Sequence, residues 1–213
     1  MKKTALILAA ALLWVVPASA EEVVRSFRQQ VPMGSASKIH LDFPVGELQV
    51  DGWDSPQVDL DVKIVCQNAT SRCEEAAQKL RLVYDASGDT LEVRVKDWPH
   101  FGATKGLHVR GAIHVPRGLA LRTDLGVGEV HIQGSAGDLT VDLGVGEVHV
   151  TLPKEAFRTA SLDTGIGEAS LVAGGRRYSS EGLITRAIHW DKGAGRAGVK
   201  VDCGVGEIHV ELE

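Results

Sequence analysis

The sequence lacks the short motifs that mark the common catalytic centres. No Gly-x-Ser-x-Gly nucleophile elbow is present, and the motifs predict no HExxH zinc site, Walker loop or dinucleotide-binding unit. Paired acids with grouped arginine or lysine, as a glycan-cleaving centre would need, are also missing. We therefore expect no catalytic residues, no enzyme activity and no cofactor.

The chain also lacks any long apolar run beyond its start. Met1–Lys3 supplies positive charge, Ala5–Val16 is apolar for 12 residues, and Ala18–Ala20 places small residues before a cut. This layout is typical of a secretory signal peptide and predicts cleavage before Glu21. The apolar run is shorter than the roughly 20 residues that span a bilayer. We expect an exported mature chain with no membrane span, in the periplasm or, alternatively, outside the cell or at its surface.

An excess of basic residues is missing too. The net charge is −5, and loss of the two leader lysines brings it to −7. Nucleic-acid-binding proteins usually carry a basic patch, and anionic lipid attracts clustered lysine and arginine. The charge therefore argues against nucleic acid and against electrostatic docking on a membrane.

Cysteine is scarce, with three in the chain. Cys66 and Cys73 flank a short polar loop, and an oxidising compartment favours a disulfide between them. Closing so short a loop contributes about 2–3 kcal/mol in the chain-entropy model. Their spacing matches no common zinc pattern. Cys203 occupies an apolar place in a repeat, so we expect it to be free and buried.

The informative feature that is present is an internal repeat. Five ungapped segments of twelve residues share Asp at the fourth place, Val or Ile at the seventh, Gly at the eighth and Glu at the ninth. The segments are Ile39–Val50, Leu121–Ile132, Leu139–Val150, Ala160–Leu171 and Val199–Val210.

Alternation inside the repeat predicts a bent strand. Apolar residues at every second place share one strand face: Leu139, Val141, Leu143 and Val145. After Gly146 the apolar places are Val148 and Val150, which is a shift of one residue. Such a shift exchanges the two faces of a strand, so the glycine marks a corner where the chain turns and resumes around the same core.

The eighth-place glycine is present in all copies, whereas Pro44 replaces the sixth-place glycine in the first copy. We expect a positive φ, or no room for a Cβ atom, at these corner glycines: Gly46, Gly128, Gly146, Gly167 and Gly206. Their spacings of 82, 18, 21 and 39 residues suggest one coil per repeat. Gly146 should then lie between Gly128 and Gly167, with a degenerate coil at Leu183–Trp190.

The first half reads differently. Val58–Val65 alternates as a strand, Arg72–Leu80 is a predicted short helix, and Leu82–Tyr84 with Leu91–Val95 forms a predicted hairpin. The predicted fold class is mainly β, a β-solenoid-like stack of Gly-x-Gly-Glu rungs with one short helix. The predicted divisions are a signal peptide at 1–20, an N-terminal β region at 21–105 and the repeat region at 106–213, although 21–213 could be one continuous domain.

These features together carry a family resemblance. Asp51–Trp53, Val115–Leu119 and the four later Gly-[Val/Ile]-Gly-Glu units resemble the bacterial "putative adhesin" (toastrack-type) β-repeat family of envelope proteins, over about residues 37–213. The resemblance implies a single-stranded β-solenoid-like fold and no known catalysis. The Glu-x-His pairs depart from the family pattern, in which the rungs often lack histidine.

Two polar columns are candidates for metal binding. The Glu-x-His pairs combine imidazole and carboxylate, which suit zinc or another transition metal. Polar strand faces usually point to water, however, so we favour a solvated outer face for them. They are Glu129 and His131, Glu147 and His149, and Glu207 and His209. Gln49 and Ser170 replace the histidine in the other copies. The fourth-place aspartates suggest calcium, but calcium-binding repeats recur every nine residues. We commit to no metal ligands.

The sequence thus predicts a non-catalytic exported envelope protein, an adhesin-like binding or scaffold module. Its partner would be a protein or glycan of the envelope or surface. One alternative is a periplasmic metal-binding protein that uses the Glu-x-His stripe. A second is a small glycan-active enzyme.

Overall fold

A computed structural model describes residues 21–68, 70–99, 105–180 and 186–213. The predicted signal peptide lies outside these residues. The described chain is mainly β with one α-helix, as predicted, and it contains no helix long and apolar enough to cross a membrane. Its elements are β1 (Glu22–Pro32), β2 (Lys38–Trp53), β3 (Gln57–Cys66), α1 (Ser71–Lys79), β4 (Arg81–Ser87), β5 (Thr90–Lys96), β6 (Leu107–Pro116), β7 (Ala120–Gln133), β8 (Leu139–Leu152), the 3-10 turn η1 (Lys154–Ala156), β9 (Phe157–Ala173), β10 (Arg176–Ser180), β11 (Arg186–Trp190) and β12 (Ala197–Leu212).

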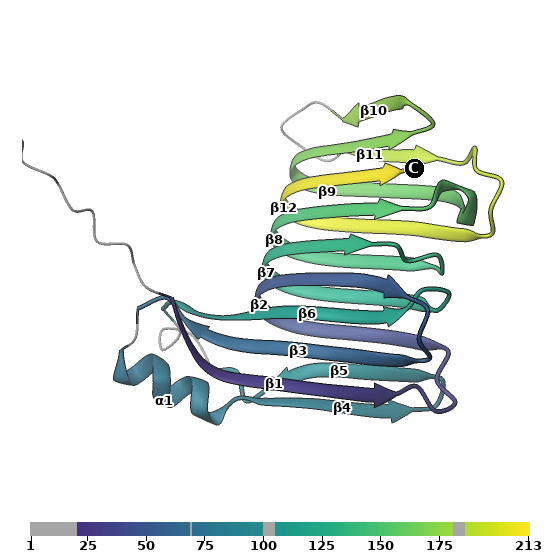
Figure 1. Cartoon of the computed structure of the whole chain (residues 1–213). Helices are drawn as coiled ribbons and strands as arrows, with labels where there is room; N and C mark the ends of the chain where they lie inside the picture. The colour runs from purple at the N-terminus through teal and green to yellow at the C-terminus, as the bar shows by residue number, and fades with distance from the viewer. Residues whose placement is uncertain (1–20, 69, 100–104, 181–185) are drawn as a thin grey trace, which may run out of the picture.

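The repeats form a stack of bent parallel strands (Figure 1). The sheet order is β1-β3-β6-β2-β7-β8-β12-β9-β10, so the five repeat strands are contiguous. They pair in register, and corner glycine lies beside corner glycine throughout. We call the part of each strand before its corner glycine the first arm and the part after it the second arm. Apolar side chains from both arms, such as Leu143 and Val148, enter one buried core.

Two separate constraints require glycine at the corner. The corner glycines have φ between 137° and 149°. Residues that carry a side chain rarely adopt such values. A Cβ atom on Gly146 would also lie 1.7 Å from the backbone oxygen of Gly128, and the other corners are similarly crowded. Both expectations for the corner glycines are met.

The structure corrects the predicted position of the phase shift. In β8 the buried first-arm residues end at Leu143 and burial resumes at Val148. Val145 was predicted to share the core face, but its side chain is 46% exposed. The bend extends over Gly144–Glu147, and it turns Val145 away from the core.

The order of stacking also differs from the prediction. β12 pairs in parallel with both β8 and β9, so the neighbours of Gly146 are Gly128 and Gly206 rather than Gly128 and Gly167. The predicted degenerate coil is wrong where it is described: β11 pairs antiparallel with the first arm of β9. Residues 183–185 of that coil lie outside the described residues. Because β12 lies between β8 and β9, the order of the strands in the stack differs from their order in the chain.

The N-terminal strands extend both arms of the stack. β6 pairs with the second arm of β2, and β3 and β1 continue outward from it. β5 pairs with the first arm of β2, and β4 completes the predicted hairpin. The sheet therefore runs continuously across the predicted boundary at residue 105.

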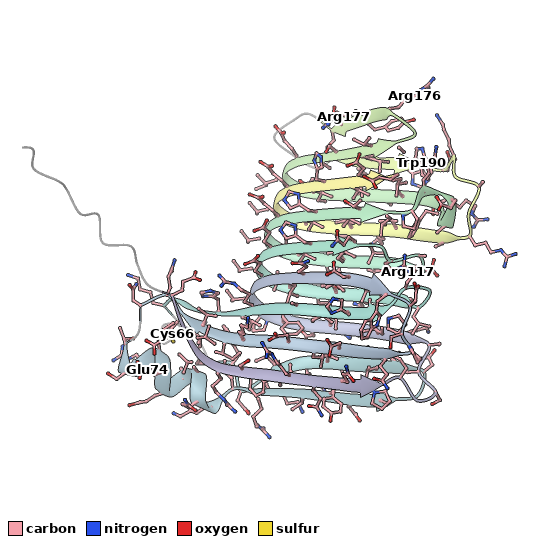
Figure 2. The ribbon with its side chains drawn as sticks, viewed as in Figure 1. Cys66, Glu74, Arg117, Arg176, Arg177 and Trp190 are labelled. Carbon is pink, nitrogen blue, oxygen red and sulfur yellow. A yellow bond between two sulfur atoms is a disulfide. The ribbon has the colours of Figure 1, made fainter. Side chains whose placement is uncertain are left out.

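The opposite end of the stack is covered by short strands. β10 and β11 pair with the second and first arms of β9. Arg176 and Arg177 lie at this end (Figure 2), and both are exposed. Charged residues on a terminal strand oppose edge-to-edge pairing with other chains.

Candidate functional site: the outer faces of the two arms

In-register pairing places the same motif position of each strand side by side on the outer face of the second arms. Two columns result, which we call the glutamate column and the histidine column. In stacking order the first holds Glu47, Glu129, Glu147, Glu207 and Glu168, and the second holds Gln49, His131, His149, His209 and Ser170. The predicted Glu-x-His residues are thus brought together on one face.

The most closely grouped side chains of these columns come from β7 and β8. Nε2 of His131 donates to Oε1 of Glu129 at 2.5 Å, and Nε2 of His149 donates to Oε2 of Glu147 at 3.3 Å. Nε2 of His149 also lies 3.9 Å from Oε1 of Glu129. The rings of His131 and His149 stack with centroids 4.8 Å apart. These groups present nitrogen and carboxylate oxygen to one small volume.

The histidine of the third pair, His209, lies apart from this group. The ring of His209 lies 6.2 Å from that of His149 and is tilted against it. Nδ1 of His209 instead lies 2.6 Å from the hydroxyl of Ser170. The histidine column therefore divides into a stacked pair and a third ring with its own partner.

The outer face of the first arms carries the aspartate column, which in stacking order holds Asp42, Asp124, Asp142, Asp202 and Asp163. Arg122 bonds to Asp124 and Asp142, and Lys200 pairs with Asp202. Nε2 of His40 lies 2.8 Å from Oδ2 of Asp124. Burial raises the pKa of Asp142, opposed by the charge of Arg122. Basic side chains thus engage Asp124, Asp142 and Asp202, which are three of the five aspartates in the column.

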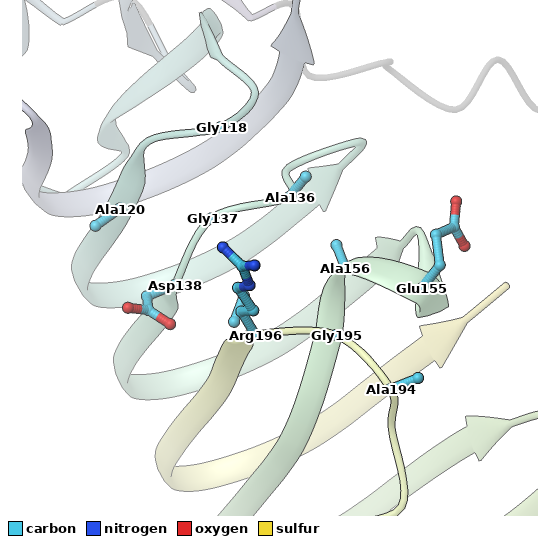
Figure 3. Close-up of a pocket in the computed structure, with 11 residues that line it drawn as sticks. Gly118, Ala120, Ala136, Gly137, Asp138, Glu155, Ala156, Ala194, Gly195 and Arg196 are labelled. Atoms are coloured by element: carbon cyan, nitrogen blue, oxygen red, sulfur yellow. The ribbon is translucent and has the colours of Figure 1, made fainter.

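Shallow, open hollows lie on the surface of the described chain. One of about 340 Å³ lies on the second-arm face, between Gln49, Asp51, His131 and Thr151. A larger one of about 580 Å³ lies among the turns at the other end of the arms (Figure 3), where Gly137, Asp138 and Arg196 line it.

Sequence reasoning passed over a glycine pattern beside that larger hollow. Gly193, Gly195 and Gly198 have the G-x-G-x-x-G spacing. A dinucleotide-binding turn needs this spacing between a strand and a helix, but here it leads into β12. The pattern instead permits close packing, because a Cβ atom on Gly195 would lie 2.1 Å from the backbone of Ala156.

Two further groupings were also missed. The seventh-place residues form an exposed apolar row along the corner, with Val127, Val145, Val205 and Ile166 each 42–55% exposed. The recurrence of Val or Ile at a place that breaks the core alternation was the available signal. Elsewhere, His114 of β6 lies between Asp51 and Asp59, at 3.9 and 3.8 Å. That grouping needs the β2–β6–β3 pairing, which no repeat predicts.

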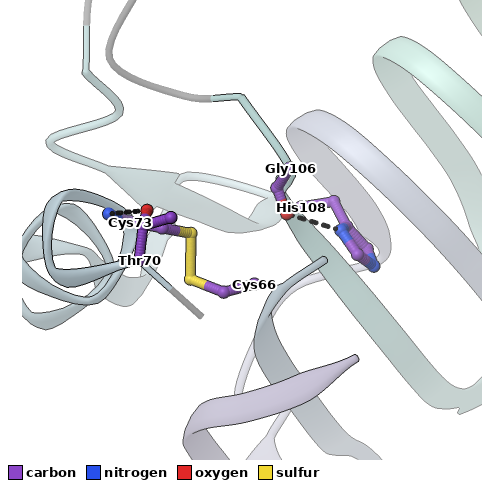
Figure 4. Close-up of a disulfide and its surroundings, with 5 residues drawn as sticks. All are labelled: Cys66, Thr70, Cys73, Gly106 and His108. Carbon is purple, nitrogen blue, oxygen red and sulfur yellow. Dashed lines mark hydrogen bonds between the residues drawn. A yellow bond between two sulfur atoms is a disulfide. The ribbon is translucent and has the colours of Figure 1, made fainter. Parts of the chain in front are cut away.

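The cysteines have structural surroundings. Cys66 and Cys73 form a disulfide that ties the end of β3 to α1 (Figure 4). The hydroxyl of Thr70 caps the helix by accepting a bond from the Cys73 amide. Cys203 is free and buried, as expected, and burial raises the pKa of its thiol.

Comparisons with known proteins identify a similar fold among solved structures. No protein-family model matches the sequence, and no curated protein matches it. A crystal structure of a putative cell adhesion protein from Clostridium sporogenes ATCC 15579 is similar, with a TM-score of 0.52 and 16% identity, over 89% of this chain and 100% of that one. At this identity the likeness concerns the fold.

Proposed function

We propose that this chain is a non-catalytic, exported binding module of the adhesin kind, as the "putative adhesin" resemblance implies. In this proposal the bent strands form a β-solenoid-like coil, and the outer face of the second arms contacts a protein or glycan of the bacterial envelope or surface. The similar crystal structure is that of a putative cell adhesion protein, which supports the same reading.

One observation carries the proposal. Five adjacent strands present equivalent outward residues in register on the second-arm face. The repeat distance is the strand spacing of about 4.8 Å. A regular polar surface of this kind offers the same contact several times in a row, which suits an extended partner. The first-arm face is less suited, because Arg122 and Lys200 already engage its carboxylates.

A matched pair of substitutions in one strand tests the choice of face. Thr140 lies on the outer face of the first arm of β8 and Thr151 on that of the second arm, and both are partly exposed. The measurement is co-sedimentation of the labelled purified protein with isolated bacterial envelopes. We expect saturable binding that Thr151→Arg weakens and Thr140→Arg leaves unchanged. Absence of binding would contradict the proposal, and so would equal loss in both variants.

A further inference from the structure

We infer that the second-arm face holds a binding site for a transition-metal ion of the Zn²⁺ type. Its ligands would be Glu129, Glu147 and His149, with His131 beside them as a fourth. The inference concerns a site within one chain and does not depend on the proposed binding function.

Convergence of ligand atoms is the first support. One oxygen from Glu129, one from Glu147 and one nitrogen from His149 all lie within 4.8 Å of one another, and this grouping is unique among the described residues. Zinc binds nitrogen and carboxylate oxygen at about 2.0–2.2 Å in a tetrahedron. Ligand atoms of such a site are about 3.3–3.5 Å apart, so small side-chain rotations would close the present geometry around an ion.

Uncompensated charge is the second, independent support. Within the described chain, the ion pairs of Glu129 and Glu147 are with histidine alone, whereas Glu47 at the end of the column pairs with Arg110. In the aspartate column on the other face, Asp142 pairs with arginine and Asp202 with lysine. Two carboxylates and neutral imidazoles balance the charge of a divalent ion.

The donor set decides the class of ion. Calcium takes six to eight oxygen ligands in its usual sites, and two imidazoles cannot contribute to such a shell. Imidazole with carboxylate suits zinc, copper or nickel. The strands that carry the ligands are paired in register, so the site links β7 to β8 and binding would oppose their separation.

Calorimetric titration of the purified, chelator-treated protein with ZnCl₂, in a chain without a histidine tag, tests the inference. We expect one zinc ion per chain. Loss of a residue that hydrogen-bonds to a metal ligand typically weakens metal binding roughly tenfold or more. His149→Gln and Glu147→Gln, which remove direct ligands, should weaken it at least as much.

His209→Gln is the matched control, because its ring belongs to the same column but bonds to Ser170. It should keep wild-type zinc affinity within about twofold, a change of only about 0.4 kcal/mol. Metal-free thermal unfolding of each variant checks that the fold is retained. The inference is overturned by absence of zinc binding, by unchanged affinity in His149→Gln, or by equal weakening in His209→Gln. One ion per two chains would also overturn it, since the ion would then bridge two copies.

Discussion

The repeat stack and the N-terminal region of this molecule are held together in different ways. In the stack, backbones approach so closely at the corners that an added Cβ atom would lie 1.7–1.9 Å from a neighbouring oxygen. In the N-terminal region, a disulfide and a capped helix secure β3 against α1. The stack thus requires glycine at its corners, whereas the N-terminal region relies on particular side chains. Substitutions should therefore damage the two regions by different mechanisms.

The largest effect is expected at a corner glycine in the middle of the stack. Gly146→Ala forces a side chain into a positive φ and into the oxygen of Gly128. We expect a loss of about 2–5 kcal/mol in the free energy of unfolding, combining the conformational cost with overpacking. Urea unfolding measures it. Gly118→Ala is the control, because its Cβ atom would meet open space; equal effects would refute the corner argument.

The sixth-place glycine should be the next most sensitive. A Cβ atom on Gly144 would lie 2.3 Å from the oxygen of Gly126, but this residue has no positive φ. Gly144→Ala should therefore cost about 1–3 kcal/mol through overpacking alone. The same urea experiment ranks it against Gly146→Ala, and a larger loss for Gly144→Ala would reverse the assignment of the two glycines.

Pro44 occupies this sixth place in the first copy, and the structure explains why a larger residue fits there but not in the later copies. The pairing of β5 with β2 ends at Asp42, and the pairing of β6 begins at Gly46. Pro44 lies between these two paired segments. In the later copies a repeat strand lies on the corresponding side, as Gly126 lies beside Gly144.

In the N-terminal region, loss of the disulfide should have an effect of comparable size to that of Gly144→Ala. The double variant Cys66→Ser with Cys73→Ser releases a short loop, and we expect a loss of about 2–3 kcal/mol. Thermal unfolding under non-reducing conditions measures the change. Adding reductant to the wild-type protein should reproduce it, and adding reductant to the double variant should have no effect. If reductant lowered the stability of the double variant, the sensitivity to reductant would not arise from the Cys66–Cys73 disulfide.

The smallest effect is expected on the outer face of the stack. His149 is partly exposed, and in metal-free protein His149→Ala should change stability by less than about 0.5 kcal/mol. Urea unfolding with chelator present measures it. A loss as large as that of Gly144→Ala would mean that the histidine column supports the fold itself.

Local pattern was enough to predict the corners, the helix, the hairpin and the columns of the second-arm face. The alternation around Gly146 reports strand periodicity, and the shared motif reports register. The position of β12 could not be predicted in this way, because any two copies of the motif can pair equally well. The outward turn of Val145 was missed because apolarity alone does not specify burial. The His114 grouping depends on pairing between β2, β6 and β3, which carry no common motif.

The most direct test of the account is the order of strands in the stack. Val145, Val205 and Ile166 occupy the same exposed motif position in β8, β12 and β9. Adjacent strands are about 4.8 Å apart, within reach of a disulfide, whereas strands one further away are beyond the limit of about 7 Å. Oxidation followed by peptide mapping should find a cross-link in Val145→Cys with Val205→Cys and none in Val145→Cys with Ile166→Cys. A cross-link in the second variant and none in the first would place β9 beside β8, in chain order, and contradict the account.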